Sequence, residues 1–128
     1  VEGERLREDF HIKAPDLYQA VGNLSGGNQQ KVMLGKWIFA EPRVLLMDEP
    51  TRGIDVGAKY EVYQIINRLA QEGRHVLLVS SEMAELIGLC DRIYVMSEGR
   101  IAGEVAGDTA TQENIMALII KGAREKVL

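Results

Sequence analysis

An α/β fold with a parallel sheet is the fold class that this sequence predicts, and two observations support it. Two unbroken apolar runs, Val44–Met47 and Val76–Val79, are typical of strands that are buried on both faces of a parallel sheet. Between them, residues 57–71 repeat apolar side chains at helical spacing. The alternation of strand and helix, continued to residue 96, indicates right-handed crossovers with helices flanking the sheet.

The N-terminal part of the chain predicts one clear helix. Residues 1–23 are charged and mixed, and residues 17–21 fit either a short helix or an extended lead-in. After the Gly26–Gly27 turn a helix is expected over about residues 28–40, and Pro42 ends it. The expected buried face of this helix carries Val32, Met33, Trp37 and Ile38.

The segment after the first strand gives the strongest helical signal. A helix is expected from about Gly57 to Gln71, and Gly73 is suited to its C-cap. Its apolar residues recur at the i, i+3, i+4, i+7 spacing of an amphipathic helix, at Val62, Ile65, Ile66 and Leu69.

The C-terminal part predicts a helix, a hairpin and a last helix. Thr109–Gln112 offers a capping box for that last helix, whose packing face carries Ile115, Leu118 and Ile119. In chain order we expect a helix from about Ser80 to Leu89, a strand at Ile93–Met96, a turn at 97–100, a strand at Ile101–Val105 and a helix through Ile120.

The composition excludes several classes of protein. A net charge of −4 without a basic stripe argues against nucleic acid as a partner. No apolar run approaches the ~18 residues that suggest a membrane-spanning helix. The single cysteine, Cys90, excludes an internal disulfide and is expected to be a small buried apolar residue. The charged start, without an initiator Met or a signal-peptide core, predicts that the sequence is a fragment of a longer protein.

The glycine turn at Ser25–Asn28 is the first candidate site. Glycines allow backbone amides to approach an anion closely, and a helix that begins there adds its unpaired N–H groups and the positive end of its dipole. Such a turn can bind phosphate. The same residues also fit an ordinary helix N-cap, because Ser and Asn cap helices. The turn by itself leaves both interpretations open.

The second candidate site is a pair of carboxylates, Asp48 and Glu49, at the end of the first apolar strand. Ligands of open α/β sheets bind at the carboxyl ends of the strands. In nucleotide hydrolysis one carboxylate at such a place holds Mg²⁺ and the next polarises the attacking water. Two solvated acids that cap a loop are an equally good interpretation of the pair by itself.

Taken together, these segments resemble an ABC-type ATPase. Leu24–Lys31 is similar to the signature motif, Val44–Thr51 to the Walker B motif, and Arg52–Asp55 follows at the place of the D-loop. Within ABC proteins the pattern resembles the ATP-binding subunits of bacterial monosaccharide importers for ribose, galactose, xylose and arabinose. Ser80–Glu82 and Cys90–Ile93 look like the second, C-terminal cassette of such a subunit. The resemblance implies a partial P-loop NTPase of RecA-like fold.

The resemblance also implies a role for each motif residue. Asp48 would take the Mg²⁺-side position, and Glu49 the position of the catalytic general base in ATP hydrolysis. The signature turn would contact ATP bound to the opposite cassette, and Asp55 would lie in the D-loop that crosses to that cassette. The ATP-binding residues implied in this way are Ser25, Gly26, Gly27, Asn28, Gln29, Asp55 and Ser81.

Two departures from the family pattern limit what these residues can do. Ser81 stands where ABC cassettes usually place a histidine that contacts the γ-phosphate, and His75 lies at the wrong end of the preceding strand to replace it. No phosphate loop occurs in the 128 residues. Its strand would lie between those at 76–79 and 93–96, so its absence leaves an interior gap in the sheet. We therefore expect poor hydrolysis at this cassette's own site and little ATPase activity from the 128 residues alone.

ATP-powered sugar import is the function that the resemblance implies. The chain would be a fragment of one nucleotide-binding domain, with the end of the helical region at 1–40, Walker B and core strands at 41–97, and a hairpin and helix at 98–128. Its cofactors would be ATP and Mg²⁺. Its partners would be a second ABC cassette and membrane permease subunits, with no nucleic acid, at the cytoplasmic face of the inner membrane. Two alternatives remain: a non-catalytic module that donates its signature turn to a partner's ATP site, and a soluble ABC ATPase of translation or DNA repair.

Overall fold

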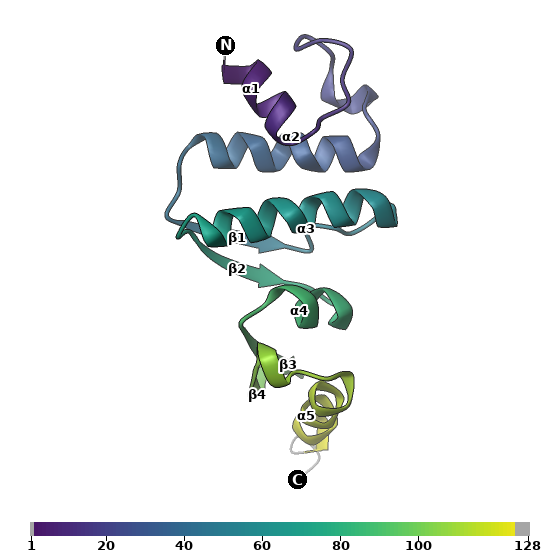
Figure 1. Ribbon diagram of the computed structural model, residues 1–128. Helices are drawn as coiled ribbons and strands as arrows, with labels where there is room; N and C mark the ends of the chain where they lie inside the picture. Colours follow the sequence, from purple (N-terminus) through teal and green to yellow (C-terminus); the bar gives the residue numbers. More distant parts are fainter. Residues whose placement is uncertain (1, 125–128) are drawn as a thin grey trace. The chain divides into compact units, whose positions relative to one another are not determined.

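The computed structural model describes residues 2–124, and these form two compact units, one up to Val79 and the other from Ser80 (Figure 1). The first unit contains three helices and two strands, and the second contains two helices and two strands. We describe each unit by itself. None of the helices among the described residues is long and apolar enough to cross a bilayer.

The first unit begins with a helix, α1 (Glu2–Asp9), that the charged N-terminal sequence did not predict. It ends in a Schellman motif: His11, at a positive φ of 48°, donates its N–H to Glu8, and the next N–H bonds to Arg7. Phe10, at the end of this helix, is buried, while His11 is exposed. Residues 17–21 do not form a helix of their own, and a single 3₁₀ turn follows at Val21–Asn23.

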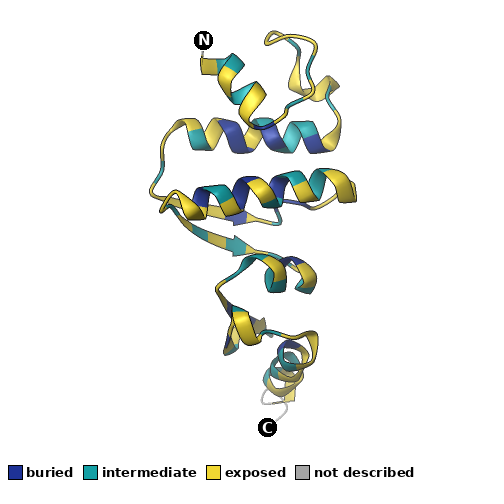
Figure 2. Ribbon diagram, in the orientation of Figure 1, coloured by how far each residue is buried: buried dark blue, intermediate teal, exposed yellow. Residues whose placement is uncertain are grey.

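The helix expected after the glycine turn is confirmed as α2 (Gly26–Phe39), but the expected buried face was wrong. Trp37 is 59% exposed and Met33 is also exposed. The buried residues of α2 are instead Gly27, Lys31, Leu34 and Gly35 (Figure 2). Small residues occupy this face because its neighbours come very close, and a Cβ added at Gly35 would lie 3.3 Å from the ring of Phe10.

The amphipathic helix is confirmed as α3 (Val56–Gln71), and its four predicted apolar residues are all buried. Its C-terminus is a complete Schellman motif. Gly73, at φ 83°, donates to Ala70, and Arg74 donates to Leu69. The sequence therefore determined this helix, its buried face and its end.

Two parallel strands, β1 (Val44–Asp48) and β2 (His75–Val79), pair in register from Val44 opposite His75 to Asp48 opposite Val79. The expectation that both faces of these strands are buried was wrong for the described residues. Leu45 and Met47 are buried, whereas Leu46 between them is 75% exposed. The reason is that α3 packs on only one face of the pair, so burial alternates along the strand.

The second unit contains α4 (Met83–Leu89), a hairpin and α5 (Gln112–Arg124). The predicted hairpin is confirmed as β3 (Arg92–Ser97) antiparallel to β4 (Arg100–Ala106). Its two-residue turn, Glu98–Gly99, has positive φ at both positions, which is the pattern of a type I′ turn.

The core of this unit lies between α5 and the hairpin. Its buried members are Ile93, Val95, Val105 and Ile115, and Leu118 and Ile119 pack against them, as the packing face predicted. The capping box at the start of α5 falls two residues later than predicted. Thr111 and Asn114 exchange hydrogen bonds between side-chain oxygen and backbone N–H, at 3.2 and 3.0 Å.

The two strand pairs are separate two-stranded sheets. In the part of the chain that the structure describes, no ladder joins β2 to β3.

Candidate functional site

The N-terminus of α2 is built on Ser25, whose extended backbone and hydroxyl make it the N-cap. Its Oγ accepts a 2.8 Å hydrogen bond from the Asn28 side-chain Nδ2 and a longer one, 3.4 Å, from the Asn28 backbone. The backbone N–H of Gln29 bonds to the Ser25 carbonyl, which starts the helical ladder. The amides of Gly26 and Gly27 precede that ladder, so they and the helix dipole favour an anion at this end.

Two side chains of the first turn form hydrogen bonds with backbone groups of the preceding segment. The Asn28 Oδ1 accepts a hydrogen bond of 2.9 Å from the Lys13 N–H. The Gln29 side-chain amide donates to the Leu24 carbonyl at 2.8 Å. Both contacts fix the shape of the turn. Gln29, which the resemblance placed against ATP, therefore holds the segment that leads into the helix.

The structure brings the turn together with Asp55. Asp55 is the N-cap of α3, and its Oδ1 accepts from Ala58 N at 3.0 Å. A Cβ added at Gly27 would lie only 2.4 Å from the Ala58 Cβ, and one added at Gly26 would lie 3.6 Å from Ile54. The helices α2 and α3 therefore run side by side in the same direction, with their N-termini adjacent (Figure 1).

An ion pair between the buried Lys31 and the half-buried Glu61 joins the two helices. The Lys31 side chain is 3% exposed, and its Nζ lies 2.5 Å from Glu61 Oε2 on α3 and 2.8 Å from the His11 carbonyl oxygen. Lys31 and Glu61 each lie six residues after the N-cap of their helix. Sequence reasoning missed this pair, because the partners are 30 residues apart and nothing local marks Lys31 as buried.

The carboxylates Asp48 and Glu49 lie at the carboxyl end of β1. Asp48 is exposed and is the last residue of the strand. Glu49 is half-buried, and its N–H donates to the Val79 carbonyl at 2.8 Å. Its φ is 47°, a left-handed conformation that costs about 1–2 kcal/mol for a residue with a side chain. The chain therefore turns at Glu49, directly after the end of β1.

Among residues 2–124, no group of three or more His, Cys, Asp or Glu side chains could hold a metal ion. In nucleotide sites Mg²⁺ is held by one or two carboxylates together with substrate phosphates and waters. An exposed carboxylate at a strand end, as Asp48 provides, is a suitable hard oxygen ligand.

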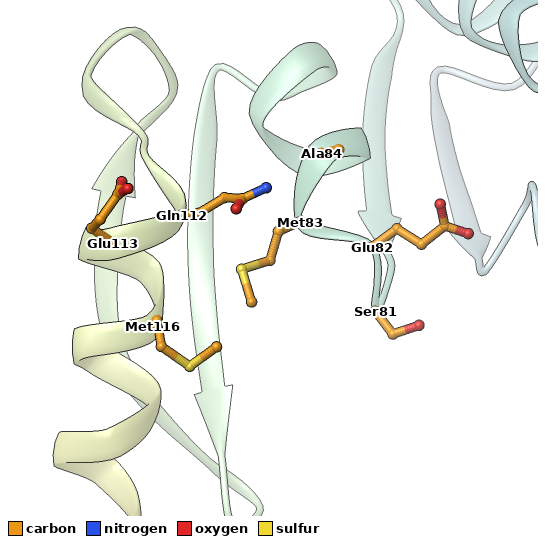
Figure 3. Close-up of a pocket in the computed structure, with 7 residues that line it drawn as sticks. All are labelled: Ser81, Glu82, Met83, Ala84, Gln112, Glu113 and Met116. Atoms are coloured by element: carbon orange, nitrogen blue, oxygen red, sulfur yellow. The ribbon is translucent and has the colours of Figure 1, made fainter.

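Ser81 belongs to the second unit, where it lines a pocket of about 580 Å³ at the starts of α4 and α5. Figure 3 shows Met83, Gln112 and Met116 pointing toward one another across this space. Ser81 and Glu82 point to the other side. Two of the lining residues are methionines, and the Ser81 side chain points away from them.

His75 is the first residue of β2, and Ser81 follows the other end of that strand. Four residue steps along the strand separate His75 from Val79 by about 13 Å. His75 therefore does not take the place of a histidine at position 81, as the sequence predicted.

Comparisons with known proteins agree with this fold and these motifs. Residues 4–52 match the family described as ABC transporter. An ATP-binding cassette of an ABC transporter in its ADP conformation superposes with a TM-score of 0.71 at 22% identity, over 98% of this chain and 48% of that one. A nucleotide-free ATP-binding cassette from an ABC transporter superposes with a TM-score of 0.72 at 23% identity, over 93% of this chain and 45% of that one. The fold is that of part of an ABC ATPase cassette.

Relatives of known name are much closer in sequence. The L-arabinose transport ATP-binding protein AraG of Geobacillus stearothermophilus is 63% identical over 123 residues, which are 96% of this chain and 24% of that protein. The ribose import ATP-binding protein RbsA of Lactococcus lactis is 55% identical over 119 residues, which are 93% of this chain and 24% of that protein. The chain spans about a quarter of the length of the curated relatives that it matches. Its residues 4–52 match the ABC transporter family, and nearly its whole length is similar to ATP-binding proteins of sugar transport.

Proposed function

We propose that this chain is part of the second nucleotide-binding cassette of a sugar importer's ATP-binding subunit, and that the full subunit binds and hydrolyses ATP to drive import. One observation carries the proposal. The glycine N-terminus of α2 lies against the start of α3 at Asp55, in a chain 63% identical to an arabinose transport ATP-binding protein. Further relatives are named for import of xylose, ribose and galactose or methyl galactoside.

The α2 N-terminus binds the phosphates of ATP held by the opposite cassette. The amides of Gly26 and Gly27 and the hydroxyl of Ser25 are donors of the kind that phosphate oxygens require. Asp55 caps the neighbouring helix and lies in the loop that reaches the same partner. A second ABC cassette is therefore the first partner, and membrane permease subunits at the cytoplasmic face of the inner membrane are the second.

Asp48 and Glu49 serve the ATP bound by this cassette itself. Asp48 would hold Mg²⁺, which neutralises charge on the phosphate oxygens when it is bound. Glu49 orients the attacking water and accepts its proton. The fixed backbone of Glu49, with its N–H bonded to Val79, limits the positions that its carboxylate can reach.

Ser81 weakens ATP hydrolysis at this cassette's own ATP site. A serine hydroxyl is short and uncharged, and it cannot supply the imidazolium that a histidine would place beside the γ-phosphate. The site then binds ATP and turns it over slowly. This favours a variant of the proposal in which the chain mainly donates its α2 turn to the partner's ATP.

Two substitutions in the full-length subunit test the assignment and separate its variants. Ser25→Ala impairs the partner's site, and Glu49→Gln removes the general base from this cassette's own site. Loss of ATP turnover and sugar import in both variants supports two working sites. Loss in Ser25→Ala alone supports the donor role. Full activity in both variants contradicts the proposal, and salt-sensitive binding of RNA or DNA would point to an ATPase of translation or repair instead.

The 128 residues alone are expected to show little ATP turnover, because they contain no phosphate loop. Purified chain incubated with Mg²⁺ and ATP, with released phosphate measured, is the assay. Sustained turnover would contradict the expectation that hydrolysis at this site requires a phosphate loop.

A further inference from the structure

We propose that Asn28 is a positioning residue, which holds the Ser25 hydroxyl so that its hydrogen points outward as a donor to the ATP phosphate. This inference rests on the proposed function, because it concerns the same phosphate contact. It assigns Asn28 a role through Ser25 and not through direct contact with the nucleotide.

The orientation of the Asn28 amide follows from its two partners. The backbone N–H of Lys13 can only donate a hydrogen bond, and it lies 2.9 Å from one end of the Asn28 side chain. That end must therefore be the carbonyl oxygen, Oδ1. The NH₂ end then faces Ser25 Oγ at 2.8 Å and must donate to it.

The donors and acceptors of the Ser25 hydroxyl determine which way its hydrogen points. A hydroxyl has two acceptor lone pairs and one hydrogen to donate. Asn28 directs two donors at Ser25 Oγ, its side-chain NH₂ at 2.8 Å and, more weakly, its backbone N–H at 3.4 Å. The lone pairs are thereby engaged, and the hydrogen of Ser25 is turned away from Asn28. A phosphate oxygen accepts only, so this is the orientation that binds it.

The segment that orients Asn28 is itself fixed in place. The buried Lys31 ammonium donates to the His11 carbonyl at 2.8 Å, one helical turn beyond Asn28. Residues 11–13 are thus attached to α2 at two points, Asn28 and Lys31. The resulting relay runs from Lys13 through Asn28 to Ser25, and it does not depend on a ligand.

A double-mutant cycle in the full-length subunit tests this relay. Ser25→Ala is expected to lower kcat/KM for ATP on the order of tenfold, the effect of one hydrogen bond to a charged group. Asn28→Ala is expected to lower it by a similar factor. The double variant is then also about tenfold impaired, whereas independent effects would multiply to about a hundredfold. Gln30→Ala, which removes an amide two residues further along α2, is the matched control and should stay within about twofold.

The outcomes separate the inference from the proposed function. An unimpaired Ser25→Ala variant contradicts the role of the turn in ATP turnover. An impaired Ser25→Ala with an unimpaired Asn28→Ala, or with multiplying effects, overturns the positioning role of Asn28 and leaves the function standing.

A direct measurement on the 128-residue chain covers the case in which a variant is unstable. In the ¹⁵N-labelled chain, the side-chain NH₂ protons of Asn28 should exchange with water more slowly than those of Gln30. Ser25→Ala should shift the Asn28 NH₂ resonances and leave those of Gln30 unchanged. Equal exchange rates for the two amides would overturn the relay.

Discussion

Replacement of Gly27 by Ala is expected to separate α2 from α3 and to destabilise the first unit. The new Cβ would lie 2.4 Å from the Ala58 Cβ, while carbon atoms in contact prefer about 3.5–4.0 Å. The two helices must therefore move apart by more than about 1 Å. Gly27 is buried, so no solvent-filled space can receive the added methyl group.

The expected magnitude is the difference between two effects. Overpacking of a close contact costs about 1–3 kcal/mol, and Ala in place of Gly in a helix returns up to about 1 kcal/mol. The net loss in free energy of unfolding is about 1–2 kcal/mol. With a urea m-value of about 1–3 kcal/mol per molar, this lowers the midpoint of unfolding by about 1 M.

Urea unfolding followed by circular dichroism and by the fluorescence of Trp37, the single tryptophan, measures this effect. Trp37 lies on α2 and so reports on the first unit. The exchange Gly27→Ala with Ala58→Gly moves the methyl group to the other helix and should restore the midpoint. Gly22→Ala, where a Cβ would meet nothing within 4 Å, should leave it unchanged. An unaffected Gly27→Ala, or a double variant as unstable as the two single changes added together, would refute the close-contact argument.

Three further predictions concern the ion pair, the cysteine and the hairpin. Lys31→Met should lower the free energy of unfolding in urea by about 1–3 kcal/mol. This is less than the roughly 3–5 kcal/mol expected when a fully buried pair is broken, because the Glu61 carboxylate is 41% exposed and keeps part of its hydration. An unfolding midpoint equal to that of the wild type would contradict this. Burial, followed by the carboxylates of Glu85 and Asp91, raises the pKa of the Cys90 thiol, so alkylation at pH 8 should be slower than in urea-unfolded chain. The folded thiol keeps its proton longer than the unfolded one, so this contribution to stability is present below about pH 8.5 and is lost as the pH rises through the folded pKa; equal alkylation rates would show an unperturbed thiol. Gly99→Ala should destabilise the hairpin by about 1–2 kcal/mol in thermal unfolding, because φ is 76° there, and a stabilised variant would rule out the type I′ turn.

Much of the fold followed from local pattern. The four apolar residues of α3 repeat at helical spacing, and all four are buried. The turn at Glu98–Gly99 and the flanking apolar residues predicted the hairpin, and the order of the glycine turn and the two carboxylates indicated the ABC family. α1 was missed, because it is charged and has no apolar stripe; its buried anchor, Phe10, follows its last residue.

The predictions that were wrong concern burial, which depends on neighbours that are distant in sequence. The buried face of α2 was predicted from its large apolar residues, but the close approach of Ala58 and Phe10 selected Gly27 and Gly35 instead. The strands were predicted to be buried on both faces, yet among the described residues Leu46 is exposed because α3 covers one face only.

The sequence by itself determined the kinds of groups that this protein carries: a glycine turn that begins a helix, two carboxylates that end a strand, and a serine at position 81. Only the tertiary structure decided how they are held. Lys31 meets Glu61 across 30 residues and Asn28 meets Lys13 across 15, and together these contacts set the Ser25 hydroxyl and align α2 with α3. The reason is physical: helical and strand periodicity depends on neighbours within a few residues, whereas a hydrogen bond or ion pair depends on a distance that exists only after the chain has folded.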